Sequence, residues 1–103
     1  MKIYTYPDIT GTGALQALKT VLGIVSQPCK LLQFTIVSNA SGNTIRLGDA
    51  AIGATQGIPL GGSTPGSTSQ FIPQISEDLR NYDVADWYVI IPSGDVLSVA
   101  YGV

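Results

Sequence analysis

The residues best suited to chemistry in this chain are acidic, and four of them fall within ten positions: Glu77, Asp78, Asp83 and Asp86. Paired carboxylates can act as general acid and base, or they can bind calcium. Their spacing does not match an EF-hand loop, and Arg80 and Asn81 lie among them. The pattern favours a solvated, partly ion-paired loop, with a weak cation site as the alternative.

Nucleophilic catalysis has little support in the sequence. The chain contains no His, the commonest general base, and its single Cys29 has neither a His nor a basic cluster beside it to lower the pKa of the thiol. Gly11-Thr12-Gly13 resembles a nucleotide-binding glycine turn, but Gln16 stands where a third Gly is needed and no βαβ pattern surrounds it. We therefore expect a turn there, no catalytic residue, no cofactor and no metal, and we do not expect an enzyme.

Three aromatic residues lie within or directly after the acidic group: Tyr82, Trp87 and Tyr88. Such rings can form a platform for a sugar. Because they lead into an apolar strand, packing in the core or at an interface is favoured over sugar binding. Asp49 and Asp95 each follow a Gly in a turn, where Asp side chains accept hydrogen bonds from nearby backbone amides, so both are predicted to be structural.

The elements that position these residues are predicted to be short strands. Between Gln27 and Val103, apolar runs alternate with clusters of Gly, Pro, Asn, Asp and Ser. This alternation of short apolar runs with turn-forming residues is typical of antiparallel β-sandwiches and barrels. We predict an all-β fold, an antiparallel, jelly-roll-like β-sandwich that forms a single domain over residues 1–103.

The N-terminal third is less regular. Residues 1–8 are aromatic and predict an edge strand or an arm that extends to residue 13, with Pro7 interrupting regular pairing. Residues 14–23 fit both helical and strand spacing, so one short helix and a strand both remain open.

Two hairpins are predicted. In residues 31–37, Leu32, Phe34 and Ile36 share one face and should point to the core, and residues 44–47 resume the alternation after a turn. Residues 87–91 and 96–101 flank a four-residue turn and would form the final hairpin, with Ile91 opposite Val96.

Both faces of this final hairpin would be apolar, so it needs a second sheet on one side and a partner or a loop on the other. A partner subunit and the chain's own Gly-rich loop are equally consistent with this need. The candidate interface residues are Trp87, Tyr88, Val89, Ile91, Val99 and Tyr101.

Residues 48–69 form a long segment rich in Gly, Ser and Thr. Its apolar members Ile52, Ile58 and Leu60 indicate that it lies over the sandwich. The part from Gly61 onward has no apolar anchor and is predicted to be an exposed tip. The candidate loop contacts to a partner are Gly61, Gly62, Ser63, Thr64 and Pro65.

The composition restricts the partners. Charged residues make up 12% of the chain and the net charge is -2, so no basic surface for nucleic acid is expected. No signal sequence and no apolar run of the roughly 18 residues that cross a bilayer is found, and one Cys implies no disulfide. We expect a protein made in a reducing cytoplasm that binds neither membrane nor nucleic acid.

Five motifs in order carry a family resemblance: Gln27-Pro28-Cys29-Lys30, residues 43–49, Gly57-Ile58-Pro59-Leu60, Trp87-Tyr88-Val89-Ile90 and residues 94–99. They resemble small β-sandwich virion proteins of tailed bacteriophages, which decorate or cement the capsid shell or belong to head or tail fibres. The resemblance implies a structural protein of the virion, a homo-oligomer, expected to be a trimer, that contacts the major capsid protein. The alternative is a receptor- or glycan-binding module of a head or tail fibre.

Overall fold

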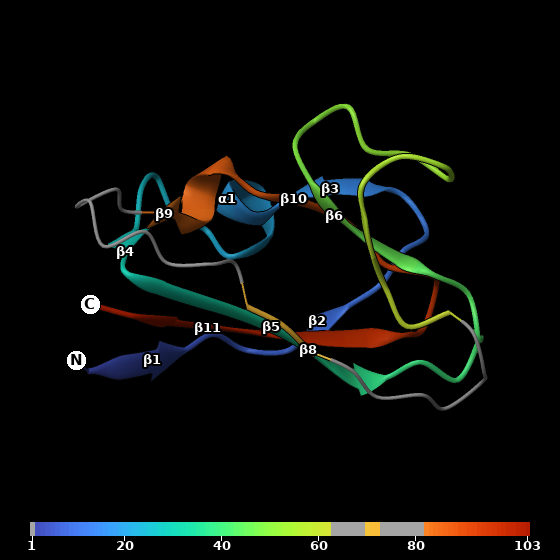
Figure 1. Cartoon of the computed structure of the whole chain (residues 1–103), viewed down its shortest axis with the longest axis horizontal. Helices are drawn as coiled ribbons and strands as arrows, with labels where there is room; N and C mark the ends of the chain where they lie inside the picture. Colours follow the sequence, from blue (N-terminus) through green and yellow to red (C-terminus); the bar gives the residue numbers. More distant parts are fainter. Residues whose placement is uncertain (1, 63–69, 73–81) are drawn as a thin grey trace.

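Two antiparallel sheets face each other and form a β-sandwich (Figure 1). The computed structural model describes residues 2–62, 70–72 and 82–103. Sheet I has the order β1-β11-β5-β8, and β2 also pairs with β11. Its strands are β1 (Ile3–Thr5), β2 (Ile9–Thr10), β5 (Leu31–Ser38), β8 (Gln70–Phe71) and β11 (Val96–Gly102).

Sheet II has the order β3-β10-β6-β7 and forms the other layer of the sandwich. Its strands are β3 (Leu15–Ala17), β6 (Ile45–Gly48), β7 (Ile58–Leu60) and β10 (Tyr88–Ile90). A small pair joins β4 (Pro28–Cys29) to β9 (Tyr82–Asp83), beside the helix α1 (Leu18–Val21) and the 3-10 turn η1 (Val84–Asp86). The all-β, jelly-roll-like sandwich is therefore confirmed, and the chain changes sheet repeatedly along its length. In the described ranges, no helix has both the length and the apolar character that crossing a membrane requires.

The core lies between the two sheets and follows the period-2 alternation of the strands. Leu32, Phe34 and Ile36 of β5 are all buried, as predicted. Leu97 and Val99 of β11 join them from sheet I. Sheet II faces them with Ile45, Leu47, Leu60 and Val89, among others.

The N-terminal segment is paired in sheet I. β1 lies antiparallel to β11 as an edge strand, and Lys2 and Val103 exchange two backbone hydrogen bonds of 3.1 Å, so the two ends of the chain lie side by side (Figure 1). The edge-strand alternative is confirmed, and a free arm over residues 1–13 is wrong. Residues 14–23 combine both open alternatives, because the strand β3 runs directly into the four-residue helix α1.

Both predicted hairpins are wrong. β5 and β6 lie in opposite sheets, and so do β10 and β11. Val96 pairs with Thr10 and Ser38 rather than with Ile91. The turns between these strands carry the chain across the sandwich, and each strand then buries one face in the same core.

The predicted loop over residues 48–69 contains a strand. β7 pairs with β6, with Pro59 on the edge strand, where its missing N–H costs no hydrogen bond of the ladder. Ile52 and Leu60 are buried, as expected for a segment that lies over the sandwich.

Gly61 and Gly62 do not form an exposed tip. A Cβ on Gly62 would lie 2.2 Å from Thr44 Oγ1, and the Gly62 N–H donates to Asn39 Oδ1 at 3.0 Å. Both glycines have positive φ and are held against the end of the sandwich. The other predicted tip contacts, Ser63, Thr64 and Pro65, lie outside the described residues.

Candidate functional site

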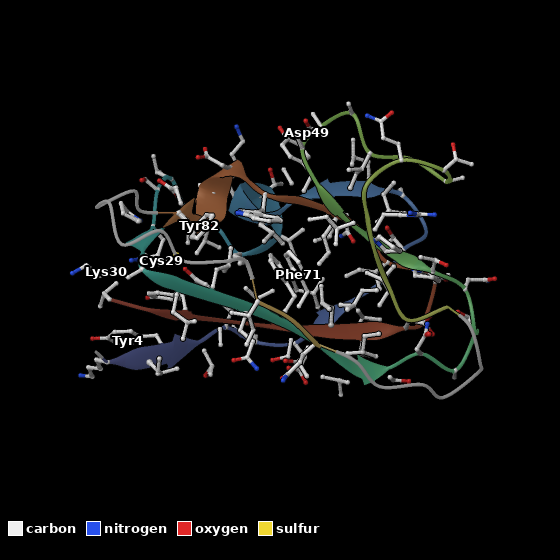
Figure 2. The ribbon with its side chains drawn as sticks, viewed as in Figure 1. Tyr4, Cys29, Lys30, Asp49, Phe71 and Tyr82 are labelled. Atoms are coloured by element: carbon white, nitrogen blue, oxygen red, sulfur yellow. The ribbon has the colours of Figure 1, made fainter. Side chains whose placement is uncertain are left out.

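A pocket of about 380 Å³ opens where the end of β6 meets β9, η1 and the start of β10. Figure 2 shows Asp49 and Tyr82 in the same layer of the molecule, on the side of sheet II. The lining residues are Gly48, Asp49, Ile58, Tyr82, Asp83, Asp86 and Trp87. Among the residues that the structure describes, the pocket thus combines two aromatic rings with three carboxylates, drawn from segments more than thirty residues apart.

Core packing fixes the position of Trp87. Its ring centroid lies 5.1 Å from that of Phe34 and 6.3 Å from that of Phe71, in tilted geometries that aromatic pairs favour. The ring is only partly buried, and it also lines the pocket. Tyr82 shares this pocket but Tyr88 does not, so the structure brings together two of the three predicted platform residues.

The Asp83 carboxylate accepts hydrogen bonds from groups of its own chain. Its Oδ1 accepts the N–H groups of Gln27 at 2.9 Å and Ala85 at 2.8 Å, and its Oδ2 accepts the hydroxyl of Ser26. Desolvation would raise the pKa of this carboxyl, but the three hydrogen bonds together lower it below its ordinary value. Asp83 therefore caps η1 and ties it to the segment before β4.

The other two carboxylates of the pocket are exposed. Asp49 Oδ1 accepts the Ala51 N–H at 2.9 Å, which confirms the predicted turn, and Asp86 lies in η1. Glu77 and Asp78 of the predicted acidic group lie outside the described residues. No group of three or more His, Cys, Asp or Glu in the described ranges is arranged to hold a metal ion.

A buried polar cluster ties together the loops at one end of the sandwich. Asp95 and Asn39 are each 1% exposed. The Asp95 carboxylate accepts the side-chain N–H of Asn39 at 2.8 Å, together with the backbone N–H and the hydroxyl of Ser41. Asp95 is structural, as predicted, but its hydrogen-bond partners lie more than fifty residues away rather than in its own turn.

The predicted interface residues differ in burial, and only Trp87, Tyr88 and Tyr101 keep some exposed surface. Val89, Ile91 and Val99 are completely buried within the chain, so they have no surface to offer a partner and this prediction is wrong. Val89 on β10 and Val99 on β11 enter the common core from opposite sheets, and Ile91 follows directly after β10. Tyr101 packs near β1, with its ring 5.3 Å from Tyr4 and 5.2 Å from Tyr6.

Sheet II turns a largely apolar face away from the core. Residues opposite one another in an antiparallel pair share a face, so the outer face of sheet II comprises Leu15, Ala17, Arg46, Pro59, Tyr88 and Ile90. Leu15 is 45% exposed. The Arg46 guanidinium donates to the carbonyls of Gly57 and Ala54, which directs its charge into the loop between β6 and β7.

Comparison of the chain with protein-family models, with curated proteins and with solved structures finds no match. The site must therefore be interpreted from its own geometry.

Cys29 is expected to be chemically inert in the folded protein. It is 2% exposed, and burial, with the charge of Asp83 adding to it, raises the pKa of its thiol to about 11. At mildly alkaline pH, the thiolate fraction should be about a hundredfold lower than for an ordinary thiol. Reaction with Ellman's reagent should be very slow in buffer and stoichiometric in denaturant; rapid reaction of the folded protein would contradict this placement.

Proposed function

We propose that the protein is a structural component of a tailed-phage virion, not an enzyme, that decorates and stabilises the capsid shell. Its partners are further copies of itself, expected as a trimer, and the major capsid protein. It is made in the host cytoplasm and resides in the virion. The motif resemblance and the β-sandwich fold support this proposal.

The observation that carries the proposal is the outer face of sheet II. Leu15 and Ile90 are direct cross-strand neighbours on it, as are Ala17 and Tyr88. These side chains project from a sheet whose opposite face already fills the core, so they do not add to the core. An apolar sheet face of this kind suits contact with another protein surface.

The predicted role of Tyr88 at an interface is retained on this basis, whereas Val89, Ile91 and Val99 are excluded from it. The inner residues hold the sandwich together, and the outer residues of the same strands remain for a partner. The order of Tyr88, Val89 and Ile90 along β10 therefore separates the two roles.

The test uses two charge substitutions at equally exposed strand positions. Leu15→Glu places a carboxylate on the outer face of sheet II, and Val37→Glu places one on β5 of sheet I, where Val37 is 49% exposed. Both proteins should fold, as judged by circular dichroism. We expect Leu15→Glu to abolish oligomerisation and binding to purified phage heads, while Val37→Glu retains both.

The measurements are light scattering over a range of concentrations and cosedimentation with heads that lack the protein. A strict monomer that does not bind heads would refute the decoration role. Equal behaviour of the two variants would refute the assignment of the docking face to sheet II.

A further inference from the structure

We propose that the pocket bounded by Asp49, Asp86 and Trp87 binds a cationic group, an alkylammonium or a guanidinium. This pocket lies at the end of sheet II, and neither Leu15 nor Ile90 of the outer face lines it. The proposal therefore stands apart from the proposed decoration role and has its own test.

The charges of the lining favour a cation. Three carboxylates border the pocket, and no Lys or Arg of the described residues lines it. Lys19 lies on α1, which packs against η1, yet it does not reach the lining. An anionic ligand would meet like charges on entering, whereas a cation would be attracted.

Two of the carboxylates remain available to a ligand. Asp83 is occupied by three donors of its own chain. The hydrogen bond of Asp49 uses Oδ1, and the Asp86 carboxylate accepts no hydrogen bond from a described residue. Because Asp49 follows β6 and Asp86 lies in η1, the two approach the pocket from different elements.

The aromatic wall strengthens the preference for a cation. Trp is the best aromatic partner of an ammonium or a guanidinium, and the attraction grows when the cation is partly desolvated in a pocket. The contacts of Trp87 with Phe34 and Phe71 hold the indole in place before any ligand arrives, which reduces the ordering that binding requires. A neutral sugar could also lie against the rings, but it would gain no attraction from the net negative charge.

The test is direct because Trp87 is the only Trp in the chain. Its fluorescence should change saturably when tetramethylammonium, butylammonium or N-methylguanidinium is added at constant ionic strength. Butylammonium and N-methylguanidinium mimic Lys and Arg side chains of a protein partner, and tetramethylammonium mimics a small-molecule quaternary amine. The strongest of the three responses identifies the source of the cation.

Two neutral-for-charged substitutions provide the comparison. Asp86→Asn removes one carboxylate of the pocket, and Asp8→Asn removes the same charge at an exposed position outside the lining. Asp86→Asn should weaken cation binding by about two- to fivefold, and Asp8→Asn should leave it unchanged.

Three outcomes would overturn the proposal. One is the absence of a saturable change with every cation, and another is an equal loss in the two variants. The third is a response to glucose or N-acetylglucosamine without a response to the cations, which would instead favour a glycan-binding pocket.

Discussion

Replacing Asp95 by alanine is expected to lower the free energy of unfolding by about 3 kcal/mol. The carboxylate is 1% exposed and accepts hydrogen bonds from the side chain of Asn39 and from the backbone and hydroxyl of Ser41. Without it, the buried Asn39 amide loses a charged acceptor in a place that water reaches poorly. Urea denaturation should show a lower midpoint at an unchanged slope.

Asp49→Ala is the matched control. Asp49 also follows a Gly and also accepts a backbone N–H, but it is exposed, so solvent can replace the lost hydrogen bond. Its removal should cost less than about 1 kcal/mol. Equal losses in the two variants would show that burial of the Asp95 cluster adds nothing to stability.

The same carboxylate should make stability sensitive to acid. Desolvation by itself would raise the pKa of Asp95, but hydrogen bonds from Ser41, Asn39 and Ala40 lower it below the ordinary value of 3.8. The stabilisation is therefore complete above the unfolded pKa and is lost as pH falls through the lower folded value. Asp95→Ala should flatten the decline in unfolding free energy below about pH 4, while the part due to Asp83 remains.

Local pattern was sufficient to predict which side chains of a strand are buried. The alternation of Leu32, Phe34 and Ile36 along β5 depends only on the period of a strand, and it correctly predicted one face of the core. Residues 14–23 fit both the strand period and the helical period, and the structure contains both elements, because the strand β3 is followed directly by the helix α1.

The sequence could not show which strands pair. A hairpin and a crossing between sheets both need two strands and a turn, so residues 92–95 are consistent with either. The apolar character of both faces in residues 87–101 arises because β10 and β11 lie in opposite sheets and bury Val89 and Val99 against a common core. Val89 and Val99 are therefore covered within the chain. On β10, only Tyr88 and Ile90, which point away from the core, are left for a partner to cover.

The pocket was only partly predictable for the same reason. Tyr82, Asp86 and Trp87 are close in sequence, and their residue types alone make them candidates. Asp49 enters the pocket through the pairing of β6 with β10, a contact that no local pattern encodes. The Asn39 and Asp95 cluster likewise joins two turn segments that look ordinary when considered separately.

Replacing Gly11 by alanine is expected to lower the free energy of unfolding by about 3 kcal/mol. A Cβ at this position would lie 2.3 Å from the carbonyl oxygen of Pro92 and 2.5 Å from that of Ile91. Both are backbone atoms, so rotation of a side chain cannot relieve the clash. The first Gly of Gly11-Thr12-Gly13 is thus required because the backbone of residues 91 and 92 approaches it too closely for any side chain.

Gly13→Ala serves as the control within the same motif. Gly13 has φ +80°, so alanine there should cost about 1–2 kcal/mol of backbone strain. The nearest atom to its Cβ would be Ser93 N at 3.9 Å, an ordinary contact. Thermal unfolding of both variants distinguishes the two effects, and a loss for Gly13→Ala as large as that for Gly11→Ala would contradict the close approach.

Gly11 and Asp95 belong to the same structural unit. The Gly11 N–H donates to the Asp95 carbonyl at 2.7 Å, and the Gly94 N–H donates to the Gly11 carbonyl at 3.1 Å. We expect Gly11→Ala to push the turn of residues 92–95 away and thereby to shift the Asp95 carboxylate relative to Asn39 and Ser41. Part of the loss from Asp95→Ala is then already present, so the double variant should lose less than the sum of the single losses, by about 1 kcal/mol. Strict additivity would instead mean that the glycine contact and the buried carboxylate stabilise the end of the sandwich independently.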